Sequence, residues 1–355
     1  MNYFVKYLNR ILACICAVMV AAFIILLFRT VVELDAIPSV MALPIEEGAY
    51  GEMPGGVDRG VFVPAESINF NTSKYIRIIP GGSYQIEWQL SPESSFETLY
   101  WYSTKPNFAT VTHEGTVNGI SKGETVIIAE TYDRSVKQSV VVAVTDMPKR
   151  ILNVPYINQL KDYPNGCESC STVMALNHVG IDITVDEFIE EYLDMCEVPY
   201  YDKNGEYVGN TPWEYFLGDP RLSTGLCCYA PVIENALEKF VDPDEYLVEG
   251  HYNESLDDLC KKYINNGIPI VFWGTMYMRE PYLMDWTWEV IGGDECETFT
   301  WVGPMHCLLL VGYDETYYYF NDPVAGKGVA YTREATEKSY EGLYMQAVTI
   351  SKIKK

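Results

Sequence analysis

Positive charge is scarce in this sequence of 355 residues. Lysine and arginine together number 25, against 49 aspartates and glutamates, which gives a formal net charge of −24. A surface with this much negative charge repels phosphate backbones, so we expect no nucleic-acid partner. Extended disorder is excluded by a different feature, because 48% of the residues are hydrophobic and 14% are aromatic, enough to form buried cores.

Cysteine is missing from a long stretch of the chain, and histidine is rare throughout. None of the ten cysteines lies between residues 17 and 166, and eight of them follow residue 150. The chain contains four histidines and no nucleotide-binding P-loop motif. A catalytic thiol is therefore to be sought in the C-terminal part of the chain, where few histidines can assist it.

A single long uncharged run, ILACICAVMVAAFIILLF, covers residues 11–28. As a helix at about 1.5 Å per residue it would reach roughly 27 Å, close to the hydrocarbon thickness of a bilayer. The sequence RTVV follows directly and is a poor cleavage site, which favours an uncleaved signal anchor over a cleaved signal peptide or a buried core helix. Lys6 and Arg10 precede the run, so the positive-inside rule predicts a cytoplasmic stub at 1–10 and a single-pass protein of the cell membrane with most of the chain outside.

The rest of the chain divides into segments that differ in composition and in hydrophobic pattern. Residues 29–67 are rich in proline, glycine and acidic side chains, which indicates a linker or stalk. Residues 68–146 contain short alternating runs such as SYQIEWQL and SVVVAV between turn residues, which predicts an all-β sandwich. After a short hinge at 147–150, residues 151–355 place helical patterns mostly first and strands mostly last, an α+β order. Within it, Thr184 is the predicted N-cap of the helix in TVDEFIEEYLDMC.

One stretch of the β-rich segment, LYWYSTKPNFATVTHEGTVNGISKGETVIIAE, carries a family resemblance. Its pattern is formed by Trp101, Ser103, Ala109, Thr110, Val111, Gly115, Val117, Gly119, Gly123 and Ile127. In these residues it resembles the bacterial immunoglobulin-like domains of group 2. The resemblance implies a sandwich that serves surface proteins as a spacer or an adhesion module, and for a single copy we prefer the spacer.

Two cysteines stand three residues apart in NGCESCSTVMALNHVG, residues 165–180. A redox pair would belong to a βαβ unit, and a zinc site would need a second ligand pair at similar spacing; the sequence offers neither. A disulfide or packed thiols without chemistry remain open. The interpretation that we favour is a single nucleophile, Cys167, at the start of a helix, where the dipole and the unpaired N–H groups lower the pKa of a thiol. Cys170 lies one turn deeper and is predicted to be a bystander.

His306 is the best candidate for the base that a thiol nucleophile needs. It opens HCLLLVGY, and Asp322 ends the next strand, TYYYFNDP. If GYDET turns between the two strands, they pair antiparallel, and Asp322 can reach and orient the imidazole. The other histidines are weaker candidates, because they lie about 16 Å along the same helix, in the β-rich segment, or in a polar loop without an orienting carboxylate: His178, His113 and His251, respectively.

Gln159, in VPYINQL, precedes Cys167 by eight residues. A side-chain amide at this position can donate to the oxyanion of a tetrahedral intermediate, together with the backbone N–H of Cys167. The four residues together predict nucleophilic attack on a carbonyl carbon, with no metal and no organic cofactor required.

Four segments in chain order carry the second resemblance: VPYINQLKDYPNGCESCSTVMALNHVGIDIT, YFLGDPRLSTGLCCYAPVI, IPIVFWGTM and MHCLLLVGYDETYYYFNDP. They resemble the papain-type cysteine peptidases of family C thirty-nine, in particular its stand-alone bacterial branch. The resemblance covers roughly residues 151–350. It implies a papain-like fold, a peptide or protein substrate, a bacterial and Gram-positive source, and these roles: Cys167 as nucleophile, His306 as base, Asp322 as its orienting group and Gln159 for the oxyanion hole. The founding members cleave double-glycine leader peptides within export transporters, and that substrate is not carried over because this chain lacks their P-loop.

The predicted architecture is multidomain: a transmembrane helix, an all-β immunoglobulin-like sandwich and an α+β papain-like peptidase domain. Two other functions stay open, a non-catalytic adhesion or scaffold protein with a degenerate peptidase domain, and an acyltransferase that passes the acyl group to an amine. The presence of all four catalytic-type residues favours the peptidase. Five tryptophans are candidates to line a substrate groove, although core packing is the better explanation for most of them: Trp213, Trp273, Trp286, Trp288 and Trp301.

Overall fold

The computed structural model of the chain describes residues 63–72, 75–148, 150–294 and 297–353. Residues 61–355 form one compact unit. The predicted stub, the predicted membrane span at 11–28 and residues 29–62 of the predicted linker lie outside the described residues.

The described helices are too short to cross a membrane. There are five of them, with 7 to 12 residues each: α2 (Cys167–His178), α3 (Val185–Glu191), α4 (Ala230–Phe240), α5 (Leu256–Lys262) and α6 (Arg333–Gly342). At about 1.5 Å per residue the longest reaches roughly 18 Å, against about 30 Å of bilayer hydrocarbon. Within the part of the chain that the structure describes, no helix has the length and apolar character of a membrane span. The described fold is mostly β, and this finding corrects the predicted fold class, with its transmembrane helix, and the predicted single-pass location at the cell membrane.

Residues 67–144 form nine strands, as the short runs of alternating hydrophobic and polar residues in this segment predict. They are β1 (Ser67–Phe70), β2 (Tyr75–Ile78), β3 (Ser83–Gln85), β4 (Trp88–Ser91), β5 (Tyr100–Ser103), β6 (Ala109–Val111), β7 (Thr116–Gly119), β8 (Gly123–Glu130) and β9 (Lys137–Val144). The paired groups β1–β4, β3–β7–β6 and β2–β9–β8–β5 enclose a core that includes Ile76, Trp101 and Val142. Membership of the immunoglobulin-like domains stays a prediction.

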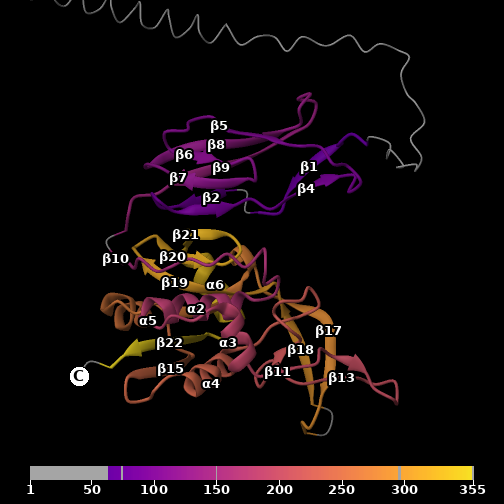
Figure 1. Cartoon of the computed structure of the whole chain (residues 1–355), viewed down its shortest axis with the longest axis vertical. Helices are drawn as coiled ribbons and strands as arrows, with labels where there is room; N and C mark the ends of the chain where they lie inside the picture. The colour runs from indigo at the N-terminus through magenta and orange to yellow at the C-terminus, as the bar shows by residue number, and fades with distance from the viewer. Residues whose placement is uncertain (1–62, 73–74, 149, 295–296, 354–355) are drawn as a thin grey trace, which may run out of the picture. The chain divides into compact units, whose positions relative to one another are not determined.

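Residues 150–352 combine the five helices with a larger number of strands. The strands are β10 (Arg150–Ile151), β11 (Met195–Cys196), β12 (Tyr200–Tyr201), β13 (Tyr207–Gly209), β14 (Phe216–Leu217), β15 (Tyr246–Tyr252), β16 (Ile270–Thr275), β17 (Tyr282–Val290), β18 (Thr298–Gly303), β19 (Met305–Tyr313), β20 (Tyr317–Asp322), β21 (Gly326–Thr332) and β22 (Gln346–Lys352). Their central sheet has the order β15–β22–β16–β19–β20–β21. Figure 1 shows β19, β20 and β21 together, with α2 and α6 close to them.

The central strand β19 separates two layers of the core. Cys307 and Leu309 belong to the cluster that contains the buried residues of α2, whereas Leu308 belongs to the cluster that contains Tyr340 of α6. This alternation follows from the two-residue period of a strand, and it explains why HCLLLVGY is hydrophobic without interruption. The strand therefore fixes the start of α2 against one face of the sheet.

The predicted N-cap of α3 is confirmed. The Thr184 hydroxyl oxygen accepts from the N–H of Glu187 at 3.2 Å, and the Glu187 carboxylate accepts from the N–H of Thr184 at 2.8 Å. This reciprocal pair is a capping box, which satisfies two N–H groups that the first turn of a helix leaves unpaired. The helix ends at Glu191, earlier than the sequence pattern suggests.

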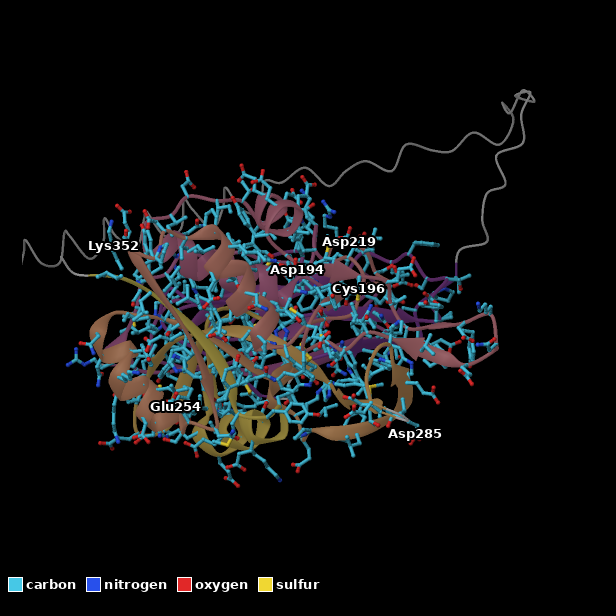
Figure 2. The ribbon with its side chains drawn as sticks, turned by 90° about the horizontal axis from the view of Figure 1, so that it is seen from below. Asp194, Cys196, Asp219, Glu254, Asp285 and Lys352 are labelled. Atoms are coloured by element: carbon cyan, nitrogen blue, oxygen red, sulfur yellow. The ribbon has the colours of Figure 1, made fainter. Side chains whose placement is uncertain are left out.

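The segment after α3 returns toward α2 through short strands. β11 pairs in parallel with β14, and two backbone hydrogen bonds flank the pair, from Phe216 to Asp194 and from Gly218 to Cys196, both at 2.8 Å. Figure 2 shows Asp194, Cys196 and Asp219 near one another at this place. After β14 the chain continues to Cys227, which belongs to the same buried hydrophobic cluster as Cys167.

The β-rich segment and the C-terminal part share one sheet. β2 pairs with β21, which extends the central sheet to eleven strands. The Gln85 N–H donates to the Ala325 carbonyl at 2.6 Å. Gly326, at φ +147°, permits this approach, because a Cβ there would lie 2.0 Å from the carbonyl oxygen of Ser83. The junction is therefore a packed backbone contact in addition to the covalent connection at 147–150.

Candidate active site

Cys167 is the first residue of α2. The helix starts after Gly166, which provides no side-chain cap, and a Cβ on Gly166 would lie 2.6 Å from the Cβ of Tyr163. A glycine is thus needed for the tight turn that delivers Cys167 to the helix start. Cys170 lies one turn deeper and is fully buried, and both cysteines are free thiols. The disulfide alternative for this pair does not occur in the structure.

His306 and Asp322 form a buried pair. β19 and β20 are antiparallel neighbours, as the turn between them predicts, and His306 Nε2 lies 2.8 Å from Asp322 Oδ1. His306 is 1% exposed and Asp322 is fully buried. The Nε2–H is committed to the carboxylate, so Nδ1 is the ring nitrogen left to accept a proton.

The carboxylate of Asp322 is held by several donors. Its Oδ1 also accepts the N–H groups of Val324 and Ala325, each at 3.0 Å, and its Oδ2 accepts the Tyr331 hydroxyl at 2.9 Å. Burial alone raises the pKa of Asp322, but the charge of His306 and these hydrogen bonds hold it below the usual value. Asp322 is therefore ionised at neutral pH and suited to stabilise an imidazolium.

Gln159 lies between the Asp322 turn and the segment that leads to Cys167. Its backbone N–H donates to the Pro323 carbonyl at 3.0 Å, and its side-chain Nε2 donates to the Pro164 carbonyl at 3.2 Å. Gln159 is 3% exposed, and its Oε1 is buried without a hydrogen-bond partner. One of the two Nε2 hydrogens remains for another acceptor.

The start of β19 brings His306 to the start of α2. The backbone N–H of Cys307, the residue after His306, lies close enough to the Cys167 sulfur to lower the pKa of that thiol, against the larger effect of burial. The Ser171 hydroxyl of α2 donates to the Cys307 carbonyl at 3.2 Å. The structure thus gathers the four residues proposed from the sequence into one region, although they are separated by more than 160 positions in the chain (322 − 159 = 163).

Glu168 is a residue of this region that the sequence pattern did not single out. Its side chain is fully buried, its Oε2 accepts the Cys167 thiol at 3.1 Å, and its Oε1 accepts the N–H of Cys228 at 2.9 Å. Burial, the largest influence, raises the pKa of Glu168 to about 7, while the Cys228 N–H and the Cys167 thiol oppose the rise. The signal available in the sequence was an acidic residue directly after Cys167, in the first turn of the predicted helix.

Cys167 does not have the lowered pKa that its position at a helix start predicts. It is 8% exposed. Burial raises the pKa of the Cys167 thiol well above the usual value, and the adjacent Glu168 carboxylate raises it further. The prediction of a stabilised thiolate is wrong for this conformation, because desolvation outweighs the helix dipole. With its pKa raised in this way, Cys167 is a protonated thiol at neutral pH.

Glu168 should make the stability of the fold depend on pH. Its pKa of about 7 lies above the 4.5 of an unperturbed glutamate, so between these values the folded state keeps a proton that the unfolded state has released. The free energy of unfolding should therefore fall as pH rises through this window. From pH 5 to pH 7.5 the wild type should lose roughly 2–3 kcal/mol relative to Glu168→Gln, which cannot ionise.

Urea denaturation of both proteins at several pH values measures this difference. The exposed Glu238 supplies the matched control, Glu238→Gln, whose pH profile should run parallel to that of the wild type. Parallel profiles for Glu168→Gln and the wild type would show that Glu168 is not buried with a raised pKa.

The remaining histidines lie away from this region. The side chain of His113, in the β-rich segment, is 88% exposed. His178 contacts the Gly267 carbonyl at 2.9 Å from the other end of α2. The expectation of a polar loop is wrong for His251, which is 2% exposed in β15 and is bonded to Glu254 and Thr349, both at 2.9 Å. Both ring nitrogens of His251 therefore have hydrogen-bond partners, and the ring is a buried part of the β15–β22 pair.

The five tryptophans mainly fill the core. Trp273, Trp288 and Trp301 are at most 8% exposed, and the other two are partly buried against the same cluster. Trp273 also donates from its indole nitrogen to the Cys228 carbonyl at 2.9 Å. Packing, the explanation preferred from the sequence, is confirmed for these three, and one of them supports the segment that contacts Glu168.

Comparisons with solved structures give low similarity. A protein from Bacillus anthracis that is assigned to the C39-like peptidases matches with 24% identity and a TM-score of 0.49, over 58% of this chain and 100% of that one. Domains 4 and 5 of the S-layer protein SbsC match with 22% identity and a TM-score of 0.20, over 23% of this chain and 53% of theirs. These values carry no functional argument.

Comparisons of sequence are more decisive. The uncharacterized protein YvpB of Bacillus subtilis (strain 168) is 28% identical over 212 residues, which cover 57% of this chain and 76% of that protein. The model of the Peptidase_C39 like family matches residues 151–348, more than half of the chain. The matched range begins before Gln159 and ends after Asp322, so it contains the whole candidate site. This chain therefore belongs to the Peptidase_C39 like family.

Proposed function

We propose that this chain is a cysteine peptidase that cleaves peptide or related amide bonds. The observation that carries the proposal is the buried His306–Asp322 pair at 2.8 Å, because the residue after His306, Cys307, is hydrogen-bonded to Ser171 of α2 at 3.2 Å and lies in the same buried cluster as Cys167. A thiol nucleophile, an imidazole base and an orienting carboxylate are the groups that acyl transfer to cysteine requires. Membership of the Peptidase_C39 like family supports the same reaction class.

In the first half of the reaction, His306 Nδ1 takes the proton of the Cys167 thiol. The thiolate attacks the carbonyl carbon of the substrate, and the C=O electron pair moves to the oxygen. The free Nε2 hydrogen of Gln159 and the backbone N–H of Cys167 then stabilise this oxyanion. The imidazolium of His306, held by Asp322, gives its proton to the departing amine, which leaves a thioester on Cys167.

In the second half, His306 removes a proton from water, and the hydroxide attacks the thioester. The sulfur leaves as thiolate and recovers the proton from the imidazolium, while the acid product departs. The residues of this chain supply every proton transfer in this sequence, and the scheme uses no metal or organic cofactor. An amine in place of water would make the same site an acyltransferase.

The test is cleavage of a diverse peptide library by the full chain, read by mass spectrometry. We expect new peptide termini with the wild type and none with Cys167→Ala. Cys196→Ala is the matched control, because Cys196 is a half-buried thiol outside the site, and it should cleave at the wild-type rate. Equal products with and without Cys167, or no products from a folded wild type, would overturn the proposal. A second library incubation with an added amine distinguishes hydrolysis from acyl transfer by product mass.

A further inference from the structure

We propose that Glu168 is a positioning residue that holds the Cys167 thiol in a resting arrangement, from which the sulfur must be released before it can react. The inference rests on the proposed role of Cys167 as nucleophile. It goes beyond that role by assigning a restraint on the thiol to a neighbouring carboxyl group. It also implies that the conformation described is a resting one, in which Cys167 is 8% exposed.

Both oxygens of the carboxyl group are engaged. Oε2 accepts the Cys167 thiol at 3.1 Å, and Oε1 accepts the N–H of Cys228 at 2.9 Å. Cys228 is in turn held by the Trp273 indole, which donates to its carbonyl at 2.9 Å. The carboxyl group is therefore anchored from a segment 60 residues away and presents its other oxygen to the sulfur.

The direction of the thiol hydrogen is what makes this arrangement a restraint. Catalysis requires the proton on Sγ to pass to His306, but in the structure the thiol donates to Glu168. A negative charge beside the sulfur also opposes formation of a second negative charge on it. Rotation of the thiol away from Oε2 would remove the first obstacle, and loss of the charge on Glu168 would remove the second.

No lysine or arginine is found among the groups of the described residues that act on the Glu168 carboxyl. The groups that interact electrostatically with its carboxyl are thiols, one hydroxyl and one imidazole. They come from α2, from the segment before α4 and from β19: Cys167, Cys170, Cys227, Cys228, Tyr229, His306 and Cys307. Among these described neighbours only His306 can become positive. The charge on Glu168 therefore acts on the thiol with little compensation.

A purely structural role would be the hydrogen bond to the Cys228 N–H alone. Glu168→Gln separates the two roles, because the glutamine Oε1 can still accept that N–H while the side chain carries no charge. The readout is the rate at which iodoacetamide alkylates Cys167 in the folded full chain, measured by peptide mapping. Alkylation needs no peptide substrate, so this test is independent of whether the proposed peptidase activity is found.

We expect Glu168→Gln to alkylate Cys167 at least about tenfold faster than the wild type near pH 8, since one unit of thiol pKa changes the thiolate fraction tenfold. The ratio should approach 1 near pH 6, where Glu168 of the wild type is protonated. Glu238→Gln should match the wild type at every pH. A ratio of 1 at all pH values, or a ratio that does not change with pH, would overturn the proposal.

The wild type alone provides a second measurement that does not depend on the folding of a variant. The logarithm of its alkylation rate should rise with slope 1 below pH 6, flatten around pH 7 as Glu168 ionises, and resume slope 1 above pH 8. A straight line of slope 1 across this range would contradict a restraint by Glu168.

Discussion

Asp322→Asn should lower kcat for peptide cleavage by about 10³–10⁴-fold, with little change in KM. Asp322 accepts the Nε2–H of His306 at 2.8 Å and is ionised because its pKa is held low. An asparagine in the same place has no charge to stabilise the imidazolium, and its amide group can present a donor to the ring. His306 would then favour the tautomer with its proton on Nδ1, which cannot accept the proton of Cys167.

Steady-state kinetics on a substrate found in the library would measure this loss. Asp285→Asn removes the same charge from an exposed position of β17 (Figure 2) and should keep the wild-type kcat. Thermal unfolding of both variants separates a lost catalytic contact from a lost fold. If folded Asp322→Asn cleaves as fast as the wild type, Asp322 does not orient the base.

Gly326→Ala should both destabilise the fold and reduce kcat. A Cβ at this position would lie 2.0 Å from the Ser83 carbonyl oxygen, and the residue has φ +147°, so the backbone of the turn has to move. The cost should be of order 2–4 kcal/mol, the range of overpacking combined with backbone strain. The preceding residue, Ala325, donates its N–H to Asp322 at 3.0 Å, so displacement of the turn disturbs the carboxylate that holds His306.

Gly205→Ala is the matched control for this change. Gly205 also has a positive φ, +84°, but a Cβ there would meet nothing within 4 Å. It should cost only about 1 kcal/mol, from the left-handed backbone, with kcat unchanged. Urea denaturation and steady-state kinetics on both variants measure the two effects. Equal losses for Gly205→Ala and Gly326→Ala would show that the close approach at the junction is unimportant.

Local sequence patterns determined a large part of the candidate site. The start of α2 directly after Gly166 agrees with the helix predicted there, and the antiparallel pairing of β19 and β20 follows from two strand patterns around a short turn. That pairing brings Asp322 to the end of the ladder near His306, with Leu309 opposite Asn321, and the side chains bridge the remaining offset of two residues. Site residues that are close in the chain, or that belong to one hairpin, could therefore be predicted from the sequence.

The pKa of the candidate nucleophile, Cys167, could not be predicted in this way. The helix dipole depends on local structure and predicts a low thiol pKa, but burial of Cys167 depends on every segment that packs around it, and burial dominates. The burial of Glu168 was not predictable either, because its partner Cys228 lies 60 residues away. His251 is buried and hydrogen-bonded only because β22 pairs with β15.

The sequence by itself determined which residues are candidates for the chemistry, because residue type, helix starts and hairpin pairing are properties of short segments. Only the tertiary structure decided that burial raises the pKa of the Cys167 thiol, that this thiol donates to Glu168, and that the β-rich segment shares a sheet with the turn that carries Asp322. The physical reason is that desolvation and charge–charge interactions are set by the contacts among segments distant in the chain.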